Sequence, residues 1–472
     1  MKTECRASKL EFESTNGRQV VASFTGNHVT SDSGLLLLRE TAERIGLFDR
    51  LASCFTDHRD PERVEHTVAE LLAQRIMGIA CGYEDLNDHT TLRHDPLFAL
   101  AAGKKDVQGR KRRAAKDEGK ALASPATLNR LELTPKDASA TSRYCKIVGD
   151  EAMLAELFVQ IFLDMHPNPP SELVLDLDAT DDPLHGKQEG RFFHGYYGHY
   201  CYLPLYIFCG DFLLCSKLRT ANRDGADGAL EEVKRIIGLI RQRWPAVPIT
   251  LRADSGFTRD ALMTWAEDNG VEYVLGLQRN TRLEKLIGDA MAAAKAEHER
   301  TGQAARTFAE LRYRTHQSWT RERRVVAKAE YLPAKANPRF VVTSLAPEVL
   351  DGRALYEDLY CARGDMENRI KEQQLWLFAD RLSAHTIRAN QLRLWFSSMA
   401  YVLLNALRHF GLAGTELAQA QAGTIRTKLL KIGAVVTISV RRIFVVLSSA
   451  SPMKWLMPRI VKNLRERLPA PS

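Results

Sequence analysis

The amino-acid sequence predicts an α/β fold, in which a mixed sheet is flanked by helices, preceded by a helical region and interrupted by a strand-rich insertion. Three observations support this prediction. Residues 31–165 carry apolar side chains mainly at helical spacing. Pro167, Pro169 and Pro170 then interrupt the chain. Beyond them, segments typical of strands and helices follow in the order β-β-β-α-β-α-β.

The helical region is predicted from four segments. Ser31 and Asp32 are candidate N-cap residues for the first segment, and Gly82 is a candidate C-terminal residue for the second. The four segments are residues 31–47, 66–82, 124–132 and 150–165.

The sheet is predicted from apolar segments that alternate with amphipathic helices. Gly210 and Asp211 form the expected hairpin turn, and Pro245 ends the first helix of this region. The expected strands are residues 173–180, 194–210, 211–221, 248–257 and 271–278, with helices at 226–245 and 258–270. A charged helix at 281–300 leads into strand-like segments at 306–332 and 338–345, which helices at 355–378 and 384–410 and two short strands within 429–449 follow.

These patterns divide the 472 residues into five expected parts. They are a helical region at 1–165, the first part of a core at 166–279, a strand-rich insertion at 280–350, the C-terminal helices of the core at 351–410, and a basic tail at 411–472.

Basic residues exceed acidic residues, 66 to 58, and they cluster in two places. Residues 104–120 hold eight basic and three acidic side chains, and residues 421–472 hold ten Lys or Arg and one acid, Glu466. Such clusters can neutralise DNA phosphates, and the alternative is that they are a solvated loop and tail. The first cluster supplies four candidate DNA-binding residues, Arg110, Lys111, Arg112 and Arg113.

Several other classes of protein are excluded by missing patterns. The eight cysteines include no CxxC pair, and the histidines lack zinc spacing, so reduced thiols in a cytoplasmic protein are expected. The N-terminus has no apolar secretion segment, and Arg441 and Arg442 interrupt the C-terminal apolar stretch, so no membrane contact is expected. P-loop, HExxH and GxSxG motifs are also missing.

Two predicted strands end in aspartates. In the first, Asp176 and Asp178 point to one face, and in the second, Asp254 lies at the strand end before Ser255 and Gly256. Adjacent carboxylates repel one another unless a cation lies between them, and a hard divalent metal fills this role in phosphoryl transfer. For each aspartate alone, the alternative is an Asx turn or a helix cap.

A third carboxylate lies on a predicted helix. Tyr360, Arg363, Glu367 and Lys371 follow one another at spacings of three and four, so all four share one helix face. This stripe suits a third metal ligand beside phosphate-binding groups. The alternative is a solvated face with an ion pair between Glu367 and Lys371.

The motifs together resemble the DDE transposases of bacterial insertion sequences, in the branch with the Tyr-Arg-Glu-Lys signature. The matching residues are Asp178-Ala179-Thr180, the Ala-Asp-Ser-Gly-Phe motif at 253–257, and Tyr360, Arg363 and Glu367. The resemblance implies an RNase H-like core in which Asp178, Asp254 and Glu367 are catalytic and hold two Mg²⁺ or Mn²⁺ ions. It also implies metal-dependent cleavage at the ends of an element and strand transfer, which together make cut-and-paste transposition. On this resemblance, 166–279 and 351–410 form the catalytic core, and the helical region at 1–165 binds the DNA ends.

The implied partners are the terminal inverted repeats of the element, the target DNA and a second copy of the chain, because two ends must be cut and joined together. The implied location is the cytoplasm of a bacterium, in association with the nucleoid. Two other functions stay open: an RNase H-like nuclease without strand transfer, and a transposase-derived DNA-binding protein without catalysis. The intact carboxylate set argues against the latter.

The sequence departs from the family pattern at one position. The signature lysine falls seven residues after the glutamate, where this chain has Gln374, so Lys371 is the nearest substitute. Similar transposases stack an aromatic residue of the insertion on a flipped base, which makes Trp319 a candidate DNA-binding residue. The alternative is an ordinary packed tryptophan. We interpret Asp176 as an ion-paired or supporting residue, and Asp181 and Asp182 as turn formers.

Overall fold

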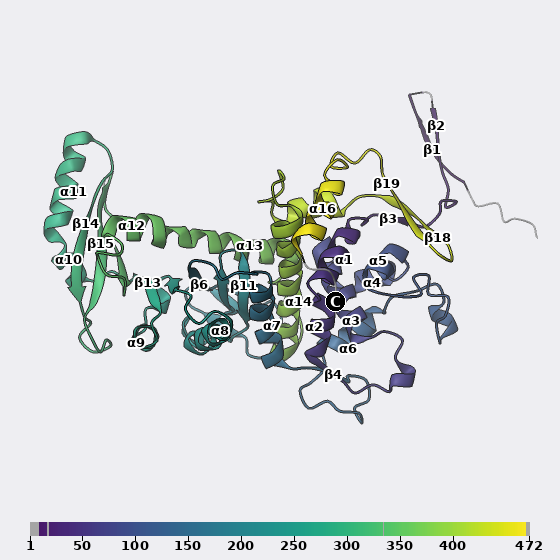
Figure 1. The fold of residues 1–472 in the computed structure, drawn as a ribbon, viewed down its shortest axis with the longest axis horizontal. Coiled ribbons are helices and arrows are strands. Elements are labelled where there is room, and N and C mark those ends of the chain that lie inside the picture. Colours follow the sequence, from purple (N-terminus) through teal and green to yellow (C-terminus); the bar gives the residue numbers. More distant parts are fainter. Residues whose placement is uncertain (1–8, 17, 334, 469–472) are drawn as a thin grey trace, which may run out of the picture. The chain divides into compact units, whose positions relative to one another are not determined.

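The computed structural model describes residues 9–468 except positions 17 and 334, and its chain forms two compact units (Figure 1). The first, here called the helical unit, consists of Met1–Asp49, Arg59–Asn129 and Ala406–Ser472. The second, here called the sheet unit, consists of Arg50–His58 and Arg130–Asn405. The division differs from the expected one, because the C-terminal segment belongs to the helical unit and the helix predicted at 150–165 belongs to the sheet unit.

A heavily buried helix, α3 (Val68–Cys81), is part of the core of the helical unit. Its N-terminus has a capping box: the Thr67 hydroxyl accepts from the Glu70 N–H, and the Glu70 carboxylate accepts from the Thr67 N–H. The helix ends at Gly82, whose φ of 93° suits a residue without a side chain. Helices α1 (Leu35–Arg44) and α5 (Pro96–Ala101) contact this apolar helix.

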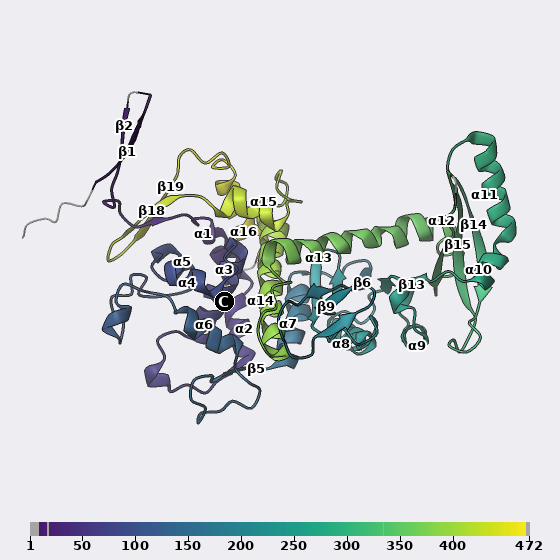
Figure 2. The same ribbon diagram turned by 180° about the vertical axis from the view of Figure 1, so that it is seen from behind.

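The C-terminal segment completes the helical unit. Strand β18 (Ala434–Ile438) pairs antiparallel with β19 (Ile443–Leu447) and with β3 (Val29–Thr30), and helix α16 (Met457–Arg467) contacts α1. Within this unit the purple N-terminal ribbon and the yellow C-terminal ribbon lie side by side in Figures 1 and 2. Segments from both ends of the sequence therefore share one core.

A buried carboxylate fastens these segments together. Asp32 is 1% exposed, and its carboxylate binds the Lys431 ammonium at 2.6 Å and accepts from the Tyr83 hydroxyl at 2.7 Å. Lys431 also lies over the Tyr83 ring, 4.0 Å from its centre. Because Asp32 precedes α1 and Lys431 precedes β18, this network joins the first and last parts of the unit.

The sheet unit is built on a nine-stranded mixed sheet, in which β16 is attached to β15 and the other strands follow the order β11-β10-β6-β12-β13-β17-β15-β14. Strand β6 runs antiparallel to β10 and parallel to β12, and β12 runs parallel to β13. The strands are β6 (Leu173–Ala179), β10 (Leu205–Cys209), β11 (Phe212–Lys217), β12 (Ile249–Ala253), β13 (Glu272–Leu277), β14 (Ala305–Tyr313), β15 (Arg323–Leu332), β16 (Lys335–Ala336) and β17 (Arg339–Thr343).

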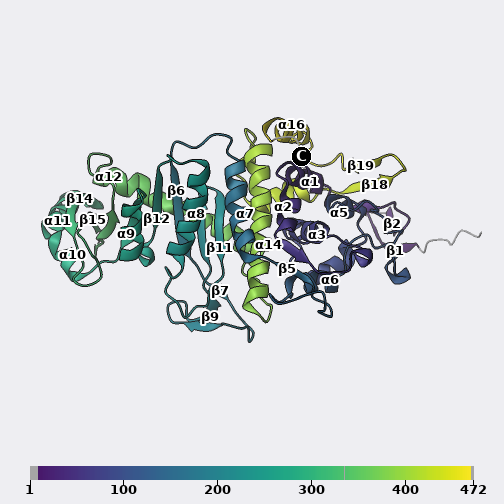
Figure 3. The same cartoon turned by 60° about the horizontal axis from the view of Figure 1, so that its bottom comes forward.

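One face of this sheet packs on two helices. Leu173, Leu175 and Leu177 of β6 are at most 2% exposed and lie in one core cluster with apolar residues of α7 (Glu151–Asp164) and α8 (Ala229–Arg243). These two helices contact each other and cover the strands in Figure 3. The pleat predicted for the first strand is therefore confirmed, and it leaves Asp176 and Asp178 on the opposite face.

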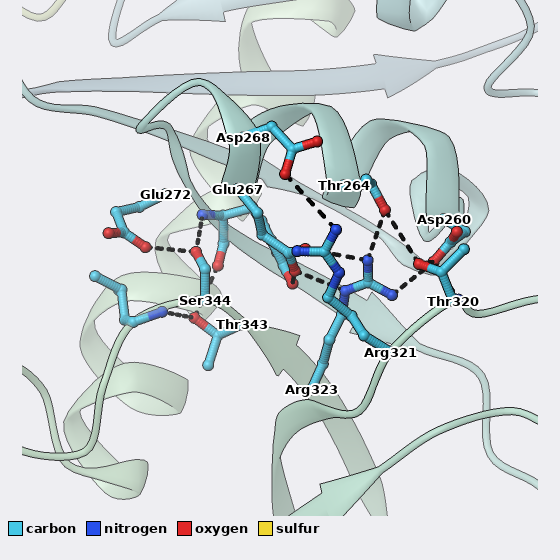
Figure 4. Close-up of polar contacts among 12 residues, drawn as sticks. Asp260, Thr264, Glu267, Asp268, Glu272, Thr320, Arg321, Arg323, Thr343 and Ser344 are labelled. Carbon is cyan, nitrogen blue, oxygen red and sulfur yellow. Dashed lines mark hydrogen bonds and ion pairs between the residues drawn. The ribbon is translucent and has the colours of Figure 1, made fainter.

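The insertion extends the core sheet instead of forming a separate layer, because β17 pairs with both β13 and β15. A buried ion-pair network fixes it to helix α9 (Asp260–Asp268) of the core (Figure 4). Arg323 of β15 is 2% exposed and binds Asp260 and Glu267, each at 2.7 Å. Burying a charged group costs free energy unless the group is paired, so the network holds the insertion against the core.

The last core segment is one continuous helical ribbon in Figure 2, with an irregular middle. It consists of α12 (Gly352–Ala354), a π-helical turn (Leu355–Tyr360), a 3₁₀ turn (Cys361–Arg363) and α13 (Gly364–Leu377). The sequence predicted a regular helix here. Such π-turns are common at functional sites, and this one ends at Tyr360, three residues before Arg363.

The remaining elements include two long helices that contact the sheet, at 288–301 and 387–406, and a number of shorter elements. In the described part of the chain, no helix combines the length and the hydropathy needed to cross a bilayer. The remaining strands and helices are β1 (Leu10–Thr15), β2 (Arg18–Ala22), α2 (Leu47–Ser53), β4 (Phe55–Asp57), α4 (His89–Leu92), α6 (Pro125–Glu132), β5 (Ile147–Gly149), β7 (Asp182–Pro183), β8 (Phe192–His194), β9 (His199–Tyr202), α10 (Thr281–Leu286), α11 (Gly288–Thr301), α14 (Ile387–Ala406) and α15 (Ala422–Ile425).

Candidate active site

Two parallel strands carry the candidate aspartates at their carboxyl ends. Leu177 of β6 lies opposite Ala253 of β12, so Asp178 and Asp254 follow the same register position on neighbouring strands. The Ala179 N–H donates to Asp178 Oδ1 at 2.9 Å, and the Gly256 N–H donates to Asp254 Oδ1 at 2.8 Å. These local bonds orient both carboxylates and do not involve their second oxygens, so the turn interpretation and a functional role are compatible.

The third candidate carboxylate, Glu367, lies in the first turn of α13 and is connected to β6 through Arg363. The Arg363 guanidinium donates to Glu367 Oε1 at 3.0 Å, and its other terminal nitrogen lies 3.9 Å from Asp178 Oδ2. Among the described residues, Glu367 thus pairs with Arg363 and not with Lys371, which is exposed. The structure therefore brings Asp178, Arg363 and Glu367 together from two separate elements.

The charges at this site act on one another. Burial raises the pKa of Asp178 to about 7, the Arg363 guanidinium lowers it, and the carboxylates of Asp254 and Glu367 raise it further. The charges of Asp254 and Glu367 are therefore near enough to act on Asp178. This is the pattern of like charges and burial that functional sites show.

Tyr360 lies against β13, next to the backbone of Asp254 and Ser255. A Cβ atom at Gly276 would lie 2.5 Å from the Tyr360 hydroxyl oxygen and 2.9 Å from the Ser255 nitrogen, so the phenol lies close against this strand beside Asp254. Burial raises the pKa of Tyr360, which keeps the phenol protonated and able to donate. A glycine is required at 276 for this close approach.

A pocket of about 300 Å³ adjoins the same strand. It is lined by Ser255 and Gly276, by the aromatic rings of Tyr356 and Tyr360, and by the cationic residue Arg339. Gln278 and Arg279 also contribute to its wall. The pocket therefore combines ring surfaces with positive charge directly next to Asp254, which suits a nucleotide better than an apolar ligand.

A buried ion pair lies beneath the site. Asp176 of β6 is opposite Arg252 of β12, and the guanidinium donates to both carboxylate oxygens, at 2.5 and 2.8 Å. Arg252 also donates to the Leu359 carbonyl at 2.7 Å, immediately before Tyr360. The interpretation of Asp176 as an ion-paired, supporting residue is confirmed, and the pair ties both strands to the helical segment that carries Tyr360 and Arg363.

The carboxylates fit a divalent cation by their chemistry. Hard cations prefer oxygen ligands, and a cation would relieve the repulsion that raises the pKa of Asp178. As far as the structure describes the chain, however, no three His, Cys, Asp or Glu side chains are grouped closely enough to hold a metal ion. Arg363, between Asp178 and Glu367, supplies the positive charge in this structure.

Gln374 has a different role from the lysine of the family pattern. Its amide donates to the Asp182 carboxylate at 3.0 Å and to the Asp181 carbonyl at 3.2 Å. Asp182 is 0% exposed, and burial raises its pKa to about 8. The interpretation of Asp181 and Asp182 as turn formers is therefore corrected: Asp182 pairs in β7 with β9, and the Asp181 carboxylate binds His199 at 2.7 Å. No pattern in the sequence signals this buried carboxylate.

Trp319 is packed in the insertion. It is 7% exposed, its ring lies edge-on to Tyr313 at 5.7 Å, and the Arg323 guanidinium lies over it at 5.5 Å. This placement favours the packed alternative over stacking on a base, because the faces that a base would need are covered by protein.

The basic loop of the helical unit is divided between exposed and tethered side chains. Arg110 and Lys111 are exposed. Arg112 donates to His66 at 2.8 Å and lies 3.5 Å from Glu65, while Arg113 donates to the Glu62 carbonyl at 3.2 Å. In the described structure, only Arg110 and Lys111 of the predicted set of four lack such side-chain bonds.

Comparison with known proteins gives one match over most of the sequence. The model of the family described as transposase DDE domain, group 1, matches residues 12–469. Among solved structures, a piggyBac transposase synaptic complex with hairpin DNA is similar, with a TM-score of 0.39, 12% identity, and coverage of 94% of this chain and 83% of that one. None of the curated proteins matches the chain.

Proposed function

Since the chain belongs to the family of group 1 transposase DDE domains, we propose that it is a cut-and-paste transposase of a bacterial insertion sequence, with Asp178, Asp254 and Glu367 as catalytic carboxylates. The observation that carries the proposal is that Arg363 pairs with Glu367 and lies 3.9 Å from Asp178, while Asp254 follows the same register position on the neighbouring strand. The arrangement Tyr360, Arg363 and Glu367 supports the branch with the Tyr-Arg-Glu-Lys signature, in which Gln374 is an exception.

We assign an RNase H-like core to the sheet unit. The support is the strand order: β11, β10 and β6 are successive antiparallel neighbours, and β12 and β13 then continue the sheet in parallel. The two aspartates lie at the carboxyl ends of adjacent parallel strands, where ligands gather in open α/β sheets.

Divalent metals are generally used by this family, and we propose two Mg²⁺ or Mn²⁺ ions for this chain, held by Asp178, Asp254 and Glu367. When bound, such ions stabilise charge on the attacking and leaving oxygens of a phosphodiester. The chain's own residues orient the DNA. Arg363, freed from the carboxylates, offers paired donors to a phosphate, and the Tyr360 hydroxyl is a further donor near Asp254.

The test is the substitution Asp254→Asn. An asparagine oxygen still accepts from the Gly256 N–H, so the turn is preserved while the charge is lost. We expect loss of nicking on a duplex carrying the element end, with duplex binding retained. Asp224→Asn is a matched control, because Asp224 also accepts from a backbone N–H two residues ahead, that of Ala226, at 2.9 Å, and lies in the same unit. Undiminished nicking by Asp254→Asn contradicts the assignment.

A second readout separates metal binding from catalysis. Mn²⁺ should raise the melting temperature of the unaltered chain, and the rise should disappear in Asp178→Asn. An equal rise in both chains would place the ion elsewhere.

Two alternatives are separated by products. A nuclease without strand transfer would release cut ends but never join them to target DNA, whereas a DNA-binding protein without catalysis would do neither. The family and the three converging carboxylates support the transposase over both. The joining assay uses pre-cut element ends with a supercoiled target, and joined products are expected only for the transposase.

We also propose that the active form on DNA is a homodimer. Two element ends must be cut and joined, and the described residues of one chain carry one set of these carboxylates. The C-terminal segment, expected as a basic tail, pairs with β3 of its own helical unit. Mass measurement of the active complex on paired ends tests the dimer, and a single chain per complex would refute it.

A further inference from the structure

The hairpin of β18 and β19, which we call the C-terminal hairpin, has one buried and one exposed face. Ala434 and Val436 are 4% and 1% exposed and face the helical unit. On the opposite face, Val435 pairs with Val446 and Thr437 with Phe444, and the two β19 residues are 61% and 49% exposed. Because β19 is also the edge strand of its three-stranded sheet, this exposed face can bind a partner.

The tip of the hairpin is built to project three side chains. The Ser439 N–H donates to the Arg442 carbonyl at 2.9 Å. The Ser439 hydroxyl also donates to this carbonyl and accepts from the Arg442 N–H. Val440 is fully exposed, and Arg441 and Arg442 are exposed beside it. None of these three side chains takes part in closing the turn, so the turn does not explain their identity.

The charge around the hairpin selects the class of partner. Residues 433–450, which include the hairpin, hold two arginines, Arg441 and Arg442, and no acidic residue. A second copy of this face would bring the same cations together, and like charges across an interface oppose association. A polyanion has the complementary charge.

We propose that the C-terminal hairpin inserts its tip into the minor groove of duplex DNA. This inference rests on the proposed transposase function and adds a binding surface to it. Arg441 and Arg442 contact the phosphates along the groove, and Val440 presses between neighbouring base steps, as apolar wedges do in proteins that bend DNA. Thr437 is the single hydrogen-bonding side chain on the exposed face of the two strands, so this surface is unsuited to reading base edges in the major groove.

The first test measures binding of the full chain to a fluorescein-labelled 30-base-pair duplex at several salt concentrations. Replacing both Arg441 and Arg442 with Ala should reduce the slope of log K against log salt by about 1.8, since each lost phosphate contact accounts for about 0.9. Replacing both with Lys should preserve the slope. The matched control replaces Lys295 and Arg300 on α11 with Ala, which removes two exposed charges from another surface and should leave the slope unchanged.

The second test measures DNA bending by energy transfer between dyes at the two ends of the duplex. Val440→Ser should keep the slope of log K against log salt, because both arginines still contact the phosphates. The variant should lose most of the DNA bend, because the apolar wedge is gone. Because the tip side chains are outside the hydrogen bonds of the turn, the melting temperature should stay the same in every variant.

Three results would overturn the proposal. An unchanged slope in the double Ala variant, with the unaltered chain still binding and cutting DNA, removes the hairpin from the DNA contact and leaves the proposed function intact. A change of oligomeric state in DNA-free solution, together with an unchanged slope, assigns the face to a second copy instead. If the unaltered chain neither binds nor cuts any duplex, the proposed function and this proposal fail together.

Discussion

The buried pair of Asp176 and Arg252 makes the substitution Asp176→Asn a sensitive probe of how the active-site segment is held. The side chains are 4% and 10% exposed, and both oxygens of the carboxylate accept from the guanidinium. Asparagine has the same shape and keeps one acceptor, but it leaves the arginine charge buried without a counter-charge.

The expected loss follows from this burial. Removing one partner of a buried pair costs about 3–5 kcal/mol of unfolding free energy, because an uncompensated charge remains in the interior. The retained acceptor of asparagine places the loss near the lower end, at about 3 kcal/mol. By contrast, the pair of Arg223 and Asp227 is 59% and 45% exposed, and Asp227→Asn should cost at most about 0.5 kcal/mol.

Urea unfolding followed by tryptophan fluorescence measures the difference, because five of the six tryptophans lie in the sheet unit. A repaired chain with Asp176→Leu and Arg252→Met should recover the stability, since apolar side chains of similar volume replace buried pairs at little cost. It should not recover cleavage, because the bond from Arg252 to the Leu359 carbonyl, which positions the segment before Tyr360, is gone. A loss below about 1 kcal/mol in Asp176→Asn would refute the argument that the charge is buried and depends on its partner.

Three further predictions address other residues. Burial and neighbouring cations lower the pKa of His66 to about 2, so below the ordinary histidine pKa the unfolded chain binds a proton that the folded chain does not bind. The unfolding free energy should therefore fall by about 1.3 kcal/mol between pH 7.5 and 5.5. Paired urea titrations should show that His66→Asn removes this part of the pH dependence. Gly276→Ala would place a Cβ 2.5 Å from the Tyr360 hydroxyl, so we expect overpacking to lower the unfolding free energy by about 1–3 kcal/mol. We also expect loss of nicking with normal duplex binding. Full nicking would show that Tyr360 moves freely. Replacing Arg110 and Lys111 with Ala should lower the slope of log K against log salt for duplex binding by about 1.8. Arg112→Ala breaks the bond to His66 and should mainly lower the melting temperature. Equal slopes in all chains would show that this loop is a solvated linker.

Features that depend on local pattern were predictable from the sequence. The pleat of β6, the capping box of α3 and the pairing of Arg363 with Glu367 at helical spacing all follow from residues near one another in the chain. The positions of Asp178 and Asp254 at strand ends were predictable for the same reason.

Features that depend on contacts between distant segments were not. Strand periodicity gives no partner, so it could not show that β17 joins the insertion to β13. It also could not show that the C-terminal segment pairs with β3. Aromatic chemistry alone made Trp319 a stacking candidate, and only the packing of Tyr313 and Arg323 around it decides otherwise.

The division of the helical unit between both ends of the sequence has a consequence for synthesis on the ribosome. Residues 130–405 emerge as one contiguous block and can fold while translation continues, but the helical unit must wait for β18 and α16. A nascent chain therefore gains its proposed catalytic carboxylates before it gains a complete helical unit. A premature stop between 406 and 430 would leave Asp32 without Lys431, and any stop before α16 would leave α1 without its contact to that helix, so such products should be unstable as well as inactive.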